Sequence, residues 1–228
     1  MIQNFLIIQP NIFLSKQKSI FDATGRLTRE AEFNPAFFLR CIQQGNILFV
    51  GEGNLSFVSS LAQLPNIPSQ RITASVYEDK IVSKDTAENA ELLKKLGISV
   101  QCGVDATKLD QHYQGNKFST IIFQFPHTGS RDPLYGHNPN FVLIRRFLKS
   151  AAPCLEEHGQ ILISAVDNPH YQGAFQFEEA AKETGYKNPE TLCFEPSSFP
   201  GYTHSNTHDD GSALDSHNKF KTWLFRKK

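Results

Sequence analysis

Short apolar segments of β-forming residues alternate along this chain of 228 residues with longer segments of helical period. Alternating or continuous apolar positions over a few residues predict strands, whereas an apolar repeat of three to four predicts amphipathic helices. The predicted strands are 47–50, 72–77, 99–103, 120–125, 160–165, 191–194 and 219–225. The predicted helices are 55–63, 85–96, 140–157 and 175–184, with Asn140 as the N-cap of the third and Gly97, Gly159 and Gly185 at helix ends.

The order of these segments predicts an α/β fold with a doubly wound, seven-stranded sheet. Strands that alternate with helices are joined by right-handed crossovers, so most of the sheet is expected to be parallel. Between 194 and 219 the chain is rich in Pro, Gly, Ser, His and Asp and has no helical period. Without a crossover helix, the last strand is expected to run antiparallel beside the sixth.

The first strand is preceded by a segment of different character. Residues 1–45 predict an N-terminal extension, and residues 46–228 predict a single Rossmann-like domain. Asn34 and Pro35 are typical of a helix start. The apolar side chains that this helix would direct to the domain are Phe37, Phe38 and Cys41.

Composition limits the function classes only mildly. Acidic and basic residues balance at 23 each, so no global field indicates a nucleic acid partner. The four cysteines are widely separated, which favours reduced thiols in a cytoplasmic protein. No apolar run is long enough to cross a bilayer, and neither export nor membrane insertion is expected.

The first strand runs into the sequence Gly51-Glu52-Gly53-Asn54-Leu55-Ser56. Two glycines permit a tight turn and a close backbone approach, and Ser56 is small enough for the helix to lie near the strand. Taken alone, the same pattern fits a strand-to-helix turn that binds nothing.

Acidic residues follow the next two strands. Glu78 and Asp79 come after the second strand, where such folds position a carboxylate for ribose hydroxyls, and Asp105 comes after the third. Each also has a structural interpretation, because Glu78 precedes Lys80 as in a surface pair and Asp105 precedes a helical turn that it would cap. A Gly-x-Gly turn and two acidic strand ends in this order favour a nucleoside-containing ligand.

The fourth strand ends in Gln124, Phe125, Pro126 and His127, beside the glycine turn in a doubly wound sheet. An amide, an aromatic face and an imidazole suit a planar substrate. The alternative is a core Phe125, a Pro126 that terminates the strand and an exposed His127.

Four segments together resemble a known family. "ILFVGEGNLSFVSSLA", "GVDATKL", "IIFQFPHTG" and "FPGYTH" are similar, in the same order, to signature segments of the ribosomal RNA uridine-N3 methyltransferase-like domain. The resemblance covers residues 46–228 and implies a class I methyltransferase fold, S-adenosylmethionine as the methyl donor and a pyrimidine of ribosomal RNA as the substrate. Gln124 stands where relatives usually have Asn, and Glu78 where they often have Asp.

The resemblance also implies roles for individual residues. The residues expected to bind the cofactor are Gly51, Glu52, Gly53, Asn54, Ser56, Glu78, Asp79, Asp105 and Ala106. Those expected to serve the reaction are Gln124, Phe125, Pro126, His127, Tyr202 and His204. Phe125 and Tyr202 would stack on a base, and His127 or His204 would accept the proton of an imide nitrogen.

Two other functions remain open from the sequence. A nicotinamide-dependent oxidoreductase shares the Gly-x-Gly turn and the following acid, and a module that binds S-adenosylmethionine or a nucleotide needs no turnover. No metal site is expected, since His204 and His208 lie in a loop without a helix to hold them together. The basic residues Arg145, Arg146 and Lys149 are interpreted as a solvated helix face, and the oligomeric state is left open.

Overall fold

The computed structural model describes residues 38, 41, 44–64, 67–130, 132–204 and 213–228. The expected helix start at Asn34 and Pro35, with Phe37, lies outside the described residues, as does His208.

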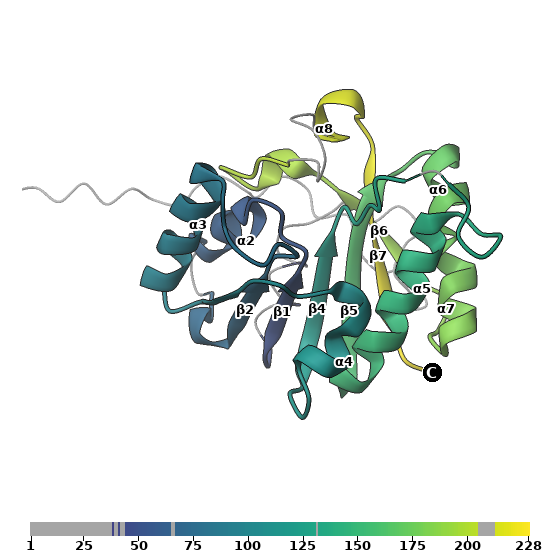
Figure 1. The fold of residues 1–228 in the computed structure, drawn as a ribbon, viewed down its shortest axis with the longest axis horizontal. Coiled ribbons are helices and arrows are strands. Elements are labelled where there is room, and N and C mark those ends of the chain that lie inside the picture. The colour runs from purple at the N-terminus through teal and green to yellow at the C-terminus, as the bar shows by residue number, and fades with distance from the viewer. Residues whose placement is uncertain (1–37, 39–40, 42–43, 65–66, 131, 205–212) are drawn as a thin grey trace, which may run out of the picture.

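A single seven-stranded sheet forms the centre of the molecule (Figure 1). Its strands are β1 Ile47–Val50, β2 Ile72–Ser75, β3 Ser99–Gln101, β4 Phe118–Gln124, β5 Leu155–Val166, β6 Glu190–Phe194 and β7 Phe220–Arg226. Their order is β3-β2-β1-β4-β5-β7-β6, and the first five in this order pair in parallel. The predicted doubly wound α/β fold is confirmed.

The last strand is antiparallel, as predicted, and lies between two neighbours. β7 pairs with β6, and it also pairs along its whole length with β5. Ser164 of β5 and Thr222 of β7 stand opposite each other and share a buried 2.8 Å hydrogen bond between their hydroxyls. The segment between Phe194 and Phe220, in whose described part the helices are no longer than the four residues of Ala213–Ser216, thus leads into a strand inserted into the sheet.

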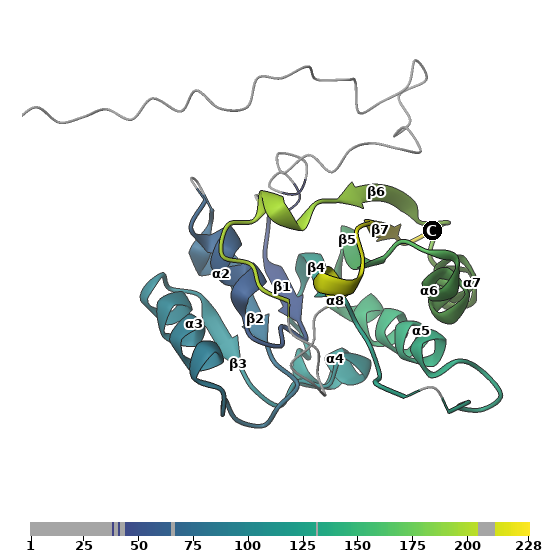
Figure 2. The same ribbon diagram turned by 90° about the horizontal axis from the view of Figure 1, so that it is seen from above.

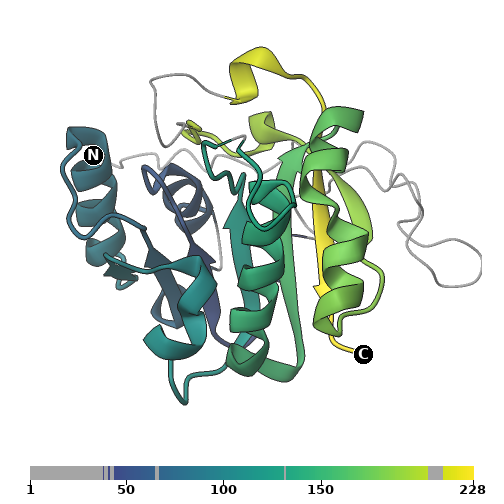
Figure 3. The ribbon, with the colours of Figure 1, turned by 45° about the vertical axis from the view of Figure 1, so that its right-hand side comes forward.

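Helices cover both faces of the sheet (Figure 2). The α-helices whose whole length lies in the described residues are α2 Ser56–Ala62, α3 Lys84–Lys95, α4 Leu109–His112, α5 Pro139–Ala151, α6 Pro169–Phe175, α7 Phe177–Thr184 and α8 Ala213–Ser216. α2 and α3 pack on one face, and α4, α5, α6 and α7 pack on the other. α8 lies beyond the carboxyl ends of the parallel strands in two views (Figures 1 and 3).

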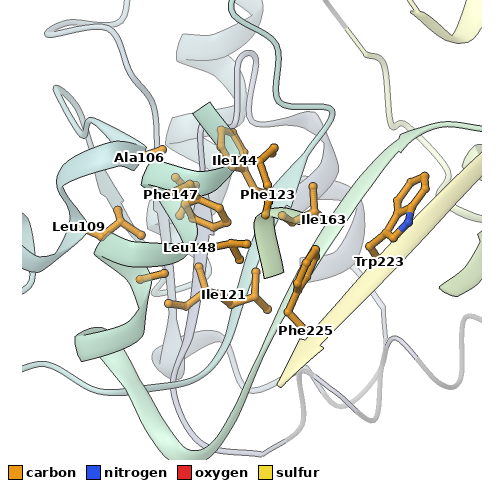
Figure 4. Packing of buried hydrophobic residues seen from close by; sticks show 14 of the residues in the cluster. Ala106, Leu109, Ile121, Phe123, Ile144, Phe147, Leu148, Ile163, Trp223 and Phe225 are labelled. Atoms are coloured by element: carbon orange, nitrogen blue, oxygen red, sulfur yellow. The ribbon is translucent and has the colours of Figure 1, made fainter. Parts of the chain in front are cut away.

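Alternation of side chains along the central strands builds two separate cores. Within β1, Leu48 and Val50 face the α5 side, whereas Ile47 and Phe49 face the α2 side, and all are fully buried. A strand buried on both faces is typical of a parallel sheet between helical layers. Figure 4 shows the core on the α5 side. There Phe147 of α5 packs against Phe123 of β4, and the centroids of the two rings are 4.9 Å apart.

The third predicted helix is wrong at both ends. Its N-cap is Asn138, whose Oδ1 accepts a 2.9 Å hydrogen bond from the Asn140 N–H, and not Asn140. The helix ends at Ala151 because Pro153 has no N–H to continue the ladder. Gly159 therefore lies within β5 and not after a helix.

The fourth predicted helix, 175–184, corresponds to α7, which begins two residues later, and the sequence did not predict α6 before it. α6 and α7 meet at Gln176, which has a left-handed φ of 47° and separates them. α6 begins after Asn168, whose side chain accepts a hydrogen bond from the Tyr171 N–H. Gly185 ends α7 and Gly97 follows α3 with left-handed backbones, as predicted.

Two described residues of the predicted extension belong to the core on the α2 side. Phe38 and Cys41 are helical and buried, at 1% and 8% exposure. The Phe38 ring packs edge-to-face on Phe57 at 5.5 Å and on Phe199 at 5.9 Å. Their predicted contact with the domain is confirmed.

Candidate functional site at the carboxyl edge of the sheet

The glycine turn after β1 has little space for a side chain. Gly51 has a φ of 63°, and a Cβ atom on it would lie 2.6 Å from Cε2 of Phe123. The next residue, Glu52, donates its N–H to the Ser75 carbonyl at the end of β2, at 2.9 Å. The turn therefore requires glycine and lies beside the end of the second strand.

The segments after β2 and β3 are joined to each other at the same edge. Val104 N–H donates to the Val76 carbonyl at 3.1 Å, and Gly103 N–H donates to the Glu78 carbonyl at 2.8 Å. Glu78 and Asp79 are both exposed, and neither carboxylate forms an ion pair within the described part of the chain. The three predicted strand ends thus lie side by side along one edge.

Asp105 caps the short 3-10 helix η2 Ala106–Lys108. Its Oδ1 accepts hydrogen bonds from the Thr107 N–H at 2.8 Å and the Thr107 hydroxyl at 2.7 Å, and Lys108 lies 3.2 Å from Oδ2. Partial burial raises the pKa of the Asp105 carboxyl, but these Thr107 and Lys108 contacts outweigh burial and hold the pKa below its usual value. The capping interpretation is confirmed, and cofactor binding by Asp105 and the largely buried Ala106 stays a prediction.

Glu52 is buried within the protein, at 4% exposure. Its Oε2 accepts a 3.2 Å hydrogen bond from the Val58 N–H of α2, and its Oε1 has no hydrogen-bond partner within the described part of the chain. Burial raises the pKa of the Glu52 carboxyl to about 8, and the Val58 bond opposes this rise. The side chain belongs to the interior, so the expected contact with the cofactor would fall to the Glu52 backbone.

Asn54 and Ser56 bind another part of the chain. Asn54 Nδ2 donates to the Thr203 carbonyl at 2.7 Å and to Thr203 Oγ1 at 3.1 Å. Ser56 Oγ donates to the same carbonyl at 2.7 Å and accepts from the Thr203 N–H at 3.1 Å. We call these three residues the Thr203 clamp. Cofactor binding by Asn54 and Ser56 stays a prediction. The sequence gave no signal that these two residues would bind Thr203.

The end of β4 carries an amide without partners. Gln124 is 8% exposed, and neither its Oε1 nor its Nε2 has a hydrogen-bond partner among the residues that the structure describes. Phe125 follows with a left-handed φ of 47°, an unusual value for an aromatic residue, and its N–H donates to the Ser164 carbonyl at 2.8 Å. Pro126 is buried and ends the strand, as the sequence predicted. The bond to β5 fixes the chain where it leaves the sheet.

His204 reaches this strand end from the distant segment 199–204. Its ring centroid lies 5.0 Å from that of Phe125. Burial lowers the pKa of the His204 imidazole, and the Asp215 carboxylate of α8 opposes this effect. His127 is exposed, and its Nδ1 accepts a 2.9 Å hydrogen bond from the Gly129 N–H. The structure brings His204 and Phe125 into contact, whereas His127 lies at the surface.

Tyr202 lines the interior on the α2 side. Its ring packs edge-to-face on Phe57 at 5.1 Å, and its hydroxyl is buried and finds no hydrogen-bond partner in the described ranges. Burial, followed by the nearby Glu52 carboxyl, raises the pKa of the Tyr202 hydroxyl well above its usual value. Base stacking by Tyr202 stays a prediction, because the ring is engaged by core residues.

The described part of the chain holds neither a cluster of metal-ligating side chains nor a membrane-spanning helix. Among these residues, no group of three or more His, Cys, Asp and Glu side chains could hold a metal ion. No helix there has the length and apolar character required to span a bilayer.

Known proteins resemble this chain in sequence and in fold. It is 31% identical over 181 residues to heavy metal-associated isoprenylated plant protein 41 of Arabidopsis thaliana, a match that covers 74% of this chain and 34% of the relative. It is 32% identical over 169 residues to an uncharacterised protein of the same plant, with 68% and 79% covered. The chain thus spans about a third of the length of the first relative and most of the second.

The fold is that of class I methyltransferases. The N-methyltransferase NodS from Bradyrhizobium japonicum superposes with a TM-score of 0.51 at 14% identity, over 84% of this chain and 93% of NodS. The model of the BMT5-like rRNA (uridine-N3-)-methyltransferases matches residues 48–206, from β1 to just beyond His204. By this match, which includes the glycine turn, the end of β4 and the Thr203 clamp, the chain belongs to the BMT5-like rRNA (uridine-N3-)-methyltransferase family.

Proposed function

We propose that this chain is an S-adenosylmethionine-dependent methyltransferase that methylates N3 of a uridine in ribosomal RNA. Family membership over residues 48–206 supports both the reaction and the substrate class. The same match does not favour the alternative of a nicotinamide-dependent oxidoreductase. All four cysteines are free thiols, which supports a location in a reducing compartment such as the cytoplasm.

The residues at the carboxyl edge fit the cofactor. Gly51, with its φ of 63°, turns the chain sharply at the carboxyl end of β1, the place where open α/β sheets bind nucleoside ligands. The free carboxylates of Glu78 and Asp79 suit the vicinal hydroxyls of a ribose, because each can accept two hydrogen bonds. The residues that would hold the cofactor are Gly51, Gly53, Glu78, Asp79, Asp105 and Ala106. When bound, S-adenosylmethionine supplies an electrophilic methyl group on a positively charged sulfur.

The observation that carries the proposal is the unpartnered amide of Gln124. A buried polar group without a partner costs about 1–3 kcal/mol, so a ligand that satisfies it recovers this cost on binding. The uracil imide edge has a carbonyl oxygen on each side of N3–H, and the Nε2–H group of an amide can donate to one of them. When N3 loses its proton, negative charge spreads to those oxygens, and a Gln124 Nε2–H donor would stabilise it.

The imide proton needs an acceptor close to the same strand end. His204 is the better placed of the two predicted imidazoles, because it contacts Phe125 and burial favours its neutral form. A neutral imidazole would accept the N3 proton and leave the N3 lone pair available for the methyl group, which the cofactor would supply as its carbon–sulfur bond breaks and the electron pair stays on sulfur. The Phe125 ring would contact the face of the base and hold it in the orientation that this attack requires.

A Gln124→Met variant tests the role of the amide. Met has a similar shape without polar atoms, so we expect a free energy of unfolding equal to or above that of the wild type. Transfer of radiolabelled methyl from S-adenosylmethionine to ribosomal RNA is expected to slow by about 10²–10³-fold, the cost of removing a donor to developing negative charge. Calorimetric affinity for S-adenosylmethionine is expected to stay unchanged.

The outcomes separate the parts of the proposal. Wild-type transfer by Gln124→Met would exclude the amide from the reaction. A wild-type protein that binds S-adenosylmethionine but transfers no methyl to RNA would instead be a binding module, and one that binds NAD in its place would be an oxidoreductase.

A further inference from the structure

The connection between β4 and α5 leaves the candidate site and projects outward beside α5 (Figures 1 and 2). It begins at Phe125 and Pro126 and ends at Asn138, the N-cap of α5. Near its start, Thr128 donates both its N–H and its hydroxyl to Asn140 Oδ1, at 3.0 Å and 3.1 Å. The base of the connection is therefore fixed to the first turn of α5.

The tip of this connection is a tight turn that presents an aromatic ring. Leu134 and His137 exchange two backbone hydrogen bonds of 2.9 Å and 3.0 Å around Tyr135 and Gly136. Both central residues have positive φ, 53° and 76°, as in the type I′ turns of hairpins. Tyr135 is 72% exposed and Leu134 is 38% exposed. The chain thus adopts an unfavourable backbone for Tyr135 and leaves its ring in solvent.

A cation of α5 lies against this ring. The guanidinium carbon of Arg146 is 5.5 Å from the Tyr135 ring centroid, and Nη2 donates a 3.4 Å hydrogen bond to the Tyr135 hydroxyl. This contact orients the ring and covers only one of its faces.

The charge of Arg146 is not neutralised within the described part of the chain. Neither Arg146 nor the exposed Lys149 forms an ion pair there, whereas the adjacent Arg145 pairs with Glu183 at 2.9 Å. An open aromatic face beside an uncompensated cation suits a ligand that carries both flat rings and negative charge.

We propose that Tyr135 and Arg146 form a docking point for a single-stranded segment of the RNA that carries the acceptor uridine. This inference rests on the proposed function. An unpaired base stacks on the open face of Tyr135, and the Arg146 guanidinium contacts an adjacent phosphate. The connection that presents Tyr135 starts at the strand end that carries Gln124, so one segment of the chain bears both the docking point and the candidate site. Because the net charge of the chain is zero, its affinity for RNA is expected to depend on a few local contacts such as these.

Binding of a fluorescently labelled, short single-stranded oligouridylate, followed by anisotropy, tests this docking point in the full chain. Tyr135→Ala is expected to weaken binding at least about fivefold, since base–aromatic stacking contributes about 1–3 kcal/mol. Tyr135→Phe keeps the ring and is expected to bind like the wild type. Arg146→Ala is expected to weaken binding and to reduce its salt dependence.

Arg145→Ala is the matched control, because this neighbouring arginine is already paired with Glu183. It is expected to leave RNA binding unchanged, and all four variants are expected to keep the wild-type calorimetric affinity for S-adenosylmethionine.

Equal affinity of Tyr135→Ala and the wild type for the oligouridylate would overturn the inference, as would a wild type that does not bind it. An equal loss of affinity for duplex RNA would also overturn it, because stacked bases cannot use the ring. Failure of the proposed function would be seen in other measurements. The wild type would then not bind S-adenosylmethionine, or would transfer no methyl group to RNA.

Discussion

At the scale of single residues, three side chains near the carboxyl edge of the sheet bury polar atoms that have no hydrogen-bond partner among the described residues. Gln124, Glu52 and Tyr202 each carry at least one such atom, although polar groups in protein interiors are almost always paired. For Glu52 the consequence is a proton held at neutral pH, because burial disfavours the carboxylate. The side chain therefore couples the stability of the glycine turn to pH.

Glu52→Gln is expected to remove a pH dependence of stability. Between pH 4.5 and about 8 the unfolded chain releases the Glu52 proton while the folded chain keeps it, so the wild-type free energy of unfolding falls as pH rises through this window. Below the window both states are protonated, and above it both are ionised. Gln mimics the neutral acid and can still accept from the Val58 N–H.

Urea denaturation of both proteins at a series of pH values measures this effect. The variant should gain stability relative to the wild type by up to about 1.4 kcal/mol per pH unit across the window. A difference between the two proteins that stays constant with pH would contradict the prediction.

At the scale of elements, the Thr203 clamp joins segments that come from opposite ends of the domain. Asn54 lies at the start of α2, and Thr203 follows the 3-10 helix η4 Pro196–Ser198 beyond β6. Asn89 of α3 donates a 2.8 Å hydrogen bond to the Asn54 carbonyl, so a third element supports the same turn. The clamp holds His204 beside Phe125 and links the cofactor side of the edge to its acceptor side.

Ser56→Ala is expected to loosen this junction. The Ser56 hydroxyl makes two hydrogen bonds to the Thr203 backbone, and their loss should lower the free energy of unfolding by about 1 kcal/mol. Hydrogen exchange of the Thr203 amide, followed by mass spectrometry of peptides that contain it, should become faster than in the wild type.

Ser60→Ala is the control on the same helix. The Ser60 hydroxyl is buried without a hydrogen-bond partner, so its removal should cost nothing and leave Thr203 exchange unchanged. Equal exchange in Ser56→Ala and the wild type would show that the clamp does not hold the segment.

At the scale of the whole molecule, the sheet carries cores on both faces, and the core on the α2 side includes residues upstream of the predicted domain start. Phe38 packs on Phe57 and Phe199, while the Cys41 carbonyl accepts a 2.9 Å hydrogen bond from the Thr120 hydroxyl of β4. The predicted boundary between the extension, 1–45, and the domain, 46–228, therefore assigns Phe38 and Cys41 to the extension, although both belong to the core of the domain.

Phe38→Ala is expected to lower the free energy of unfolding by about 3–5 kcal/mol, the usual cost of deleting a fully buried aromatic side chain. Urea denaturation measures this loss. Val82→Ala serves as the control, since Val82 is 81% exposed and its truncation should change stability by less than about 0.5 kcal/mol. A loss from Phe38→Ala as small as that of the control would mean that the segment contributes little to the core.

The sequence by itself determined the kind and order of the strands and which residues stand at their ends. Glycine turns, prolines and apolar alternation are local properties, so Gly51, Glu78 and Gln124 could be assigned to strand ends before any fold was known. The same local signals misplaced the ends of α5, because either Asn138 or Asn140 is a plausible cap by composition and only the backbone geometry selects Asn138.

The tertiary structure alone decided which of these residues are free to bind a ligand. Asn54 and Ser56 pair with Thr203, which is 149 and 147 positions away, and Glu52 is turned inward beside Tyr202. The hydrogen-bond partner and the burial of a side chain depend on which distant segments of the chain pack against it. Side-chain periodicity is a local property and carries no information about those contacts. The insertion of β7 between β5 and β6, which completes the sheet, was decided in the same way.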